Sequence, residues 1–127
     1  MRTLLFVVLL SLALLPCSGE PAFDPAKLAG QWRYEDEPQH QTARYVFNAD
    51  GKFTSELRQG DELLRKFSGQ WTIEEGMIVY TYETDSLGKV FAGARERDRL
   101  ERLDETSYTI EAGDGAHRTY WRVKEVN

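Results

Sequence analysis

Along most of the chain, apolar and polar residues alternate at a spacing of two, and turn residues interrupt the alternation roughly every eight to twelve positions. Because successive side chains of a strand point to opposite faces, each such segment offers one face to a core and one to solvent. The pattern predicts strands over 30–35, 42–47, 52–59, 62–73, 77–84, 89–93, 107–111 and 118–124. We therefore predict a mostly β protein, with about eight antiparallel strands in an up-and-down barrel or a half-open sheet.

The segment 94–103 fits two structures. Asp98 and Arg102 are four positions apart and would support a helix. A helix, however, would present only Leu100 and Leu103 to a core, which is a thin apolar face. The alternation of charges favours a strand, with a helix as the alternative.

A short helical turn is predicted before the first strand. Asp24 supplies a side-chain acceptor at a helix N-cap, and Pro25 has its φ fixed for the first helical position. One turn from Pro25 to Leu28 then leads through Gly30 to Trp32. A second glycine, Gly69, is expected to bend the long strand over 62–73.

The first nineteen residues have the features of a secretory signal peptide. A basic start is followed by an apolar run from Leu4 to Leu15 and by small residues up to Gly19. This run is too short for a transmembrane helix, which needs about 20 apolar residues. We divide the chain into a signal peptide (1–19) and one β domain (20–127), exported to the periplasm or secreted. In the alternative, Cys17 is the lipidated first residue of a tethered lipoprotein, although Pro16 departs from the bacterial lipobox.

Composition excludes two classes of partner and one source of stability. The net charge is −5 for the whole chain, and removal of 1–19 takes away only Arg2, giving 15 − 21 = −6. This balance argues against nucleic acid and anionic membranes as partners. Since Cys17 is the only cysteine, no disulfide within the chain can form, and the fold depends on packing.

Three short motifs carry a resemblance to a known family: Leu28-Ala29-Gly30-Gln31-Trp32 after the helical turn, the hairpin Phe47-Asn48-Ala49-Asp50-Gly51, and the closing Tyr120-Trp121-Arg122-Val123. With them the chain resembles the small lipocalin-like domains of bacterial envelope and secreted proteins, within the wider calycin group. The resemblance implies that Gly30 and Trp32 lie at the closed end of a barrel. It also implies that Arg122, or failing that Arg118, stacks on Trp32.

The resemblance further implies a cup for a small apolar or amphipathic molecule. Its lining would come from the inward faces of the strands, and the candidate ligand-binding residues are Tyr45, Phe53, Leu57, Tyr80, Tyr82 and Arg97. Two alternatives remain. The aromatic residues could fill the core of so small a barrel, and Arg95, Arg97 and Arg99 could lie on a solvated outer face.

The sequence contains no catalytic constellation. His40 and His117 are the only histidines, and no His or Cys cluster stands at metal-ligand spacing. We therefore predict no enzyme activity, no metal and no cofactor. The expected function is binding of a small apolar or amphipathic molecule by a monomer. The alternative is a filled barrel that acts as a protein-interaction or envelope module.

Overall fold

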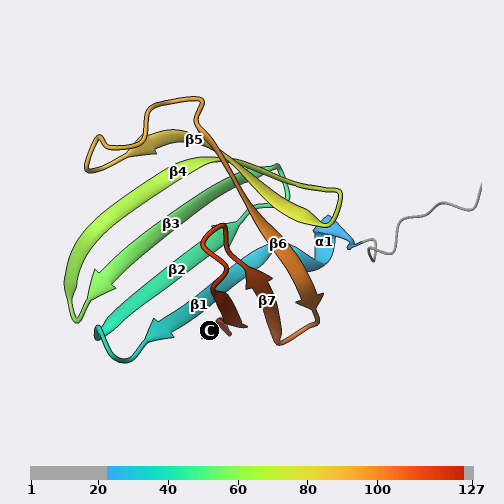
Figure 1. Cartoon of the computed structure of the whole chain (residues 1–127), viewed down its shortest axis with the longest axis horizontal. Helices are drawn as coiled ribbons and strands as arrows, with labels where there is room; N and C mark the ends of the chain where they lie inside the picture. The colour runs from blue at the N-terminus through green and yellow to red at the C-terminus, as the bar shows by residue number, and fades with distance from the viewer. Residues whose placement is uncertain (1–22, 125–127) are drawn as a thin grey trace, which may run out of the picture.

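The computed structural model describes residues 23–124 and shows a closed barrel of eight antiparallel strands (Figure 1). Each strand pairs with its neighbour in sequence, and the first strand pairs with the last. The elements are α1 (Pro25–Leu28), β1 (Gly30–Asp36), β2 (Gln41–Phe47), β3 (Lys52–Gln59), β4 (Glu62–Glu74), β5 (Met77–Asp85), β6 (Arg95–Leu103), β7 (Ser107–Glu111) and β8 (His117–Arg122). The predicted signal peptide and Cys17 lie outside the described residues.

The barrel has a closed end and an open end. The closed end carries α1 and the loops 48–51, 75–76 and 104–106, whereas the open end carries the loops 37–40, 60–61, 86–94 and 112–116. Figure 1 shows α1 far from the β3–β4 turn, which lies at the open end. Within residues 23–124 no helix reaches the length and hydrophobicity that crossing a membrane requires.

The predicted antiparallel, up-and-down arrangement is confirmed, and one predicted strand is wrong. Residues 94–103 contain β6, so the strand alternative is correct for this segment. Residues 89–93 form no strand. The backbone N–H groups of Lys89 and Val90 both donate to the Asp85 carboxylate, at 2.9 Å each, and are therefore not available to a sheet.

The closed end is built on α1. Asp24 caps this turn by accepting a hydrogen bond from the Ala26 N–H at 2.9 Å. The Leu28 carbonyl then accepts a hydrogen bond from Trp32 Nε1 at 2.8 Å, and both side chains are fully buried. The capped turn therefore holds the first core tryptophan in place.

Aromatic side chains fill the interior of the barrel toward the closed end. The rings of Trp32 and Tyr108 meet edge to face at 4.8 Å between centroids, and Tyr108 stacks on Tyr120, also at 4.8 Å. Phe47 packs against Trp71 at 5.1 Å. In this half, the structure agrees with the alternative in which the aromatic residues form a packed core.

The junction between β1 and β8, which we call the seam, is short. The pairs Trp32↔Arg122 and Arg33↔Trp121 join the two strands, and just after β8 the Val123 N–H donates to the Gln31 carbonyl at 2.9 Å. The remaining parts of β1 and β8, toward the open end, have no paired residues between them in the described chain. The barrel is thus closed by its first and last strands over a small fraction of their length.

Candidate functional site

A cavity of about 270 Å³ lies at the open end, between β1, β2, β3 and β8. Most of the lining residues lie on the inner face of the barrel, since each stands an even number of positions from a buried residue of the same strand or is itself buried. Tyr34 stands two positions after the buried Trp32, and Arg118 stands two positions before the buried Tyr120. The apolar and aromatic part of the lining consists of Tyr34, Ala43, Leu57 and Tyr120, and the polar part consists of Asp36, Gln39, Gln41 and Arg118.

The aromatic wall of the cavity continues into the core. The rings of Tyr34 and Tyr120 lie 5.4 Å apart, and Tyr45 meets Tyr120 edge to face at 5.5 Å. On the polar side, Arg118 is half-buried, and its Nη2 lies 3.7 Å from the Asp114 carboxylate. The cavity thus combines ring faces with one guanidinium group, a combination suited to an amphipathic molecule.

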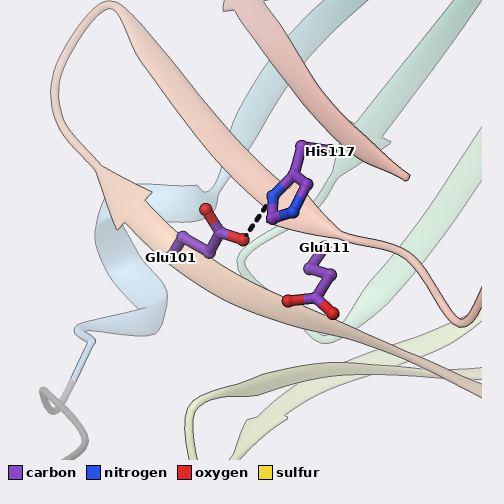
Figure 2. A group of neighbouring side chains, drawn as sticks. All are labelled: Glu101, Glu111 and His117. Carbon is purple, nitrogen blue, oxygen red and sulfur yellow. Dashed lines mark ion pairs between the residues drawn. The ribbon is translucent and has the colours of Figure 1, made fainter. Parts of the chain in front are cut away.

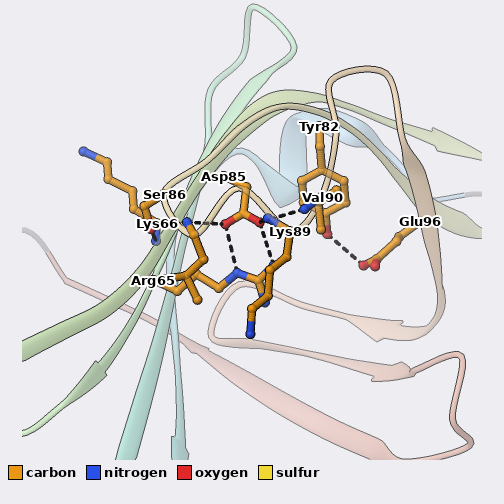
Figure 3. A network of polar contacts seen from close by, with 9 residues as sticks. Arg65, Lys66, Tyr82, Asp85, Ser86, Lys89, Val90 and Glu96 are labelled. Carbon is orange, nitrogen blue, oxygen red and sulfur yellow. Dashed lines mark hydrogen bonds and ion pairs between the residues drawn. The ribbon is translucent and has the colours of Figure 1, made fainter.

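Two carboxylates of β6 reach the interior tyrosines. Glu96 Oε2 accepts a hydrogen bond from the Tyr82 hydroxyl at 2.8 Å (Figure 3). Burial raises the pKa of Asp98 from its usual 3.8 to about 6, although a hydrogen bond from Tyr80 and the charge of Arg118 act in the opposite direction. Burial, together with the charges of Asp98 and Glu96, raises the pKa of Tyr45 to about 12. These tyrosines therefore stay neutral and can donate hydrogen bonds at physiological pH.

The hydroxyl of Tyr108 is a further polar group of the interior. Its residue is fully buried, and among the described residues the hydroxyl has no hydrogen-bond partner. Burial raises its pKa well above the usual 10. A buried donor without a partner costs folding free energy, so this hydroxyl is a local cost of the packed aromatic core.

The loop 86–94, at the open end, is organised by Asp85. Its side chain has no exposed surface and accepts hydrogen bonds from Arg65 Nε at 3.0 Å and Arg65 Nη2 at 2.7 Å, and from three backbone N–H groups of the loop (Figure 3). The Arg65 guanidinium holds the pKa of this carboxyl well below its usual range, and the backbone donors act in the same direction. The carboxylate therefore fixes the loop against β4 and β5.

The candidate binding residues divide into three groups: one residue that lines the cavity, four aromatic residues in or against the core, and Arg97 on the outer face. Leu57 lines the cavity. Phe53, Tyr80 and Tyr82 are buried in the aromatic core, and the half-buried Tyr45 packs against it.

Arg97 lies on the outer face, so it is not part of the interior lining. The reason is the register of β6. Leu100 enters the core, so two-residue alternation brings Asp98 and Glu96 inward and turns Arg97 to solvent.

Sequence reasoning missed most of the cavity. Tyr34, Tyr120 and Arg118 stand two or four positions from Trp32 or Arg122, so extension of the alternation along the first and last strands would have found them. Gln39 belongs to the turn 37–40, and no strand pattern points to it. The side chains at the mouth of a barrel depend on how the strands close, which alternation does not specify.

Comparison with known proteins supports the fold. No protein-family model and no curated protein sequence matches the chain. Among solved structures, a crystal structure of a lipocalin-like protein from Bacteroides uniformis is similar, with a TM-score of 0.55 and 17% sequence identity over 76% of this chain and 99% of that one. The barrel is lipocalin-like. At this identity the likeness establishes the fold, and the chemistry of the site has to be argued from the side chains.

Proposed function

We propose that this lipocalin-like barrel binds a small apolar or amphipathic molecule in the open-end cavity and performs no chemistry on it. The cavity carries the proposal, because Tyr34, Leu57 and Tyr120 offer an apolar wall beside the Arg118 guanidinium. Its volume of about 270 Å³ lies just below the range of roughly 300–1,000 Å³ typical of small-molecule sites, which favours a compact ligand. In this arrangement the apolar wall holds the body of the ligand and Arg118 holds its polar group.

The first experiment is native mass spectrometry of the protein purified from its own host. A non-covalent molecule that leaves on unfolding would support the proposal and give the mass of the ligand. A second experiment measures binding of 1-anilinonaphthalene-8-sulfonate, an amphipathic anion, by fluorescence. Ala43→Phe places a ring in the cavity and should weaken binding at least tenfold, whereas Ala92→Phe, in the exposed part of the loop 86–94, should not. Equal binding by both variants would contradict the proposed site.

A second candidate function is protein binding on the outer surface, beside the seam. Trp121 is 58% exposed and lines a groove of about 510 Å³ together with Arg33 and Thr119. Tryptophan and arginine are the residue types enriched at binding hot spots. A partner retained by the parent and by Ala43→Phe, but lost by Trp121→Ala, would favour this function.

Light scattering with gel filtration would test our expectation of a monomer.

We also propose that the protein is exported by residues 1–19. The apolar run from Leu4 to Leu15 supports this proposal, and Cys17 supports the tethered alternative. Cell fractionation with intact mass measurement tests both. A soluble product that begins near residue 20 would support free export. A membrane-bound product with the added mass of acyl chains, released by Cys17→Ser, would support the lipoprotein.

A further inference from the structure

Three potential metal ligands from three neighbouring strands meet on the outer face of the barrel (Figure 2). They are Glu101 of β6, Glu111 of β7 and His117 of β8, and their ligand atoms all lie within 4.8 Å of one another. His117 Nδ1 lies 2.7 Å from Glu101 Oε1. The cluster lies on the opposite side of the sheet from the open-end cavity, so a metal ion bound there would be independent of the proposed function.

Strand register explains how residues far apart in sequence come together here. Glu111 and His117 are direct partners across the β7–β8 pair. In the β6–β7 pair the register shifts between Leu100 and Arg102, which makes Glu101 the extra residue of a β-bulge. Bulges change the direction of a side chain, and this one leaves both Glu101 and Arg102 exposed after the buried Leu100. Glu101 can therefore reach across β7 to a histidine on β8.

We propose that Glu101, Glu111 and His117 bind a divalent transition metal ion, with Zn²⁺ as the best match. One imidazole nitrogen and two carboxylate oxygens form a ligand set that zinc accepts, with solvent in the fourth position. Bond lengths of about 2.1 Å place two ligand atoms on a tetrahedral zinc ion about 3.4 Å apart. In the structure the ligand atoms lie within 4.8 Å of one another. Rotation of the glutamate side chains can shorten the longer of these distances to the separation that zinc requires.

A surface ion pair is the simplest alternative account of these residues. An ion pair between Glu101 and His117 needs no second carboxylate, whereas Glu111 brings another negative charge to the same place. A shared divalent ion offsets the repulsion between the two carboxylates. Arg99 lies opposite Glu111 in the β6–β7 register, so the site also has a positively charged residue as its neighbour.

The test is calorimetric titration of the purified protein, without a histidine tag, with Zn²⁺ in a buffer that does not bind metals. We expect saturable binding of one ion per chain. His117→Ala should abolish it, and Glu111→Gln should weaken it at least tenfold. The matched control is His40→Ala, which removes the other histidine, at the exposed β1–β2 turn, and should bind like the parent.

A second readout identifies the ligands directly. In imidazole nitrogen NMR spectra, Zn²⁺ should shift the signals of His117 and leave those of His40 in place. Zn²⁺ should also raise the thermal midpoint of the parent and of His40→Ala, but not that of His117→Ala. Absence of binding by the parent, or undiminished binding by His117→Ala, would overturn the proposal. Because the three side chains lie on the surface, all variants should fold without metal.

Discussion

The Arg122 guanidinium lies 4.1 Å from the ring centroid of Trp32 and covers the tryptophan at the closed end. It also donates hydrogen bonds to three backbone carbonyls, those of Glu105 at 2.7 Å, Lys27 at 2.9 Å and Ala29 at 3.2 Å. One side chain of β8 thus joins α1, β1 and the β6–β7 turn. Gly30 leaves room for it, since a Cβ at that position would overlap the guanidinium.

Truncation of Trp32 should be among the most damaging changes at the closed end. We expect Trp32→Ala to lower the free energy of unfolding by about 3–5 kcal/mol, because it removes a fully buried aromatic side chain. Trp32→Phe should cost clearly less, since it keeps one ring. Urea unfolding measures both values, and an unchanged midpoint for Trp32→Ala would show that this residue does not organise the closed end.

Arg122→Lys should destabilise the protein although it keeps the charge. Lysine is a point charge without the planar fork of arginine, so it cannot reproduce three hydrogen bonds and a stacked contact at once. We expect a loss of about 1–3 kcal/mol in urea unfolding. Arg97→Lys, on the exposed face of β6, is the control and should stay within about 0.5 kcal/mol of the parent. Equal stability of the two variants would contradict the role of Arg122.

Gly69→Ala should strain the contact between β4 and β5. A Cβ at Gly69 would overlap the Thr81 carbonyl oxygen, and a backbone atom cannot move aside as a flexible side chain can. We expect a loss of about 1–3 kcal/mol in thermal or urea unfolding. Gly113→Ala is the matched control, because nothing lies within 4 Å of its added Cβ. The β4–β5 register shifts between Ser68 and Gly69, and a neutral Gly69→Ala would mean that the backbone adapts easily at this irregularity.

Asp98 should make the protein less stable as the pH rises from about 4 to above 6. Its pKa is about 6 in the folded protein against 3.8 in the unfolded chain, so the folded state holds a proton that the unfolded state releases. The stabilisation is complete below the unfolded pKa and is lost as the pH rises through the folded pKa. The shift corresponds to at most about 3 kcal/mol.

Asp98→Asn isolates this effect, because the amide keeps an acceptor for the Tyr80 hydroxyl without the charge. We expect the variant to gain stability over the parent between pH 4 and pH 7, as measured by urea unfolding at both values. A constant difference between the two proteins across this range would show that Asp98 ionises normally in the fold.

Asp85→Asn should release the loop 86–94. The parent carboxylate keeps its low pKa through Arg65, so its stabilising contribution is present above pH 3.8 and is lost as the pH falls below it. We expect faster hydrogen exchange at the Lys89 and Val90 amides, together with a lower thermal midpoint at neutral pH. The deficit should shrink in acid. Asp61→Asn, in the exposed β3–β4 turn, should change neither quantity.

Local patterns were sufficient to predict most of the strands. The helical turn over Pro25–Leu28 and the strands Lys52–Gln59 and Ser107–Glu111 have the predicted bounds, because capping, alternation and turn chemistry all act over a few residues. The loop 86–94 could not be predicted in this way. Its conformation depends on a salt bridge from β4 to β5, between residues twenty positions apart.

The functional residues depended on register more than on pattern. The position of Arg97 follows from the inward orientation of Leu100, which the sequence alone does not fix. Glu101, Glu111 and His117 have no spacing typical of a metal site, and only a bulge and two strand pairings bring them together. The open-end cavity likewise exists only after β8 has returned to β1.

The short seam between β1 and β8 has a consequence for the order of folding. Every other strand pair joins neighbours in sequence and can form as a hairpin, whereas Trp32 and Arg122 are 90 positions apart. Closing so long a loop costs conformational entropy, which at the seam only the two residue pairs and the contacts of Arg122 offset. Barrel closure should therefore be the last step of folding, and the seam should be the first part of the sheet to open when the native protein fluctuates.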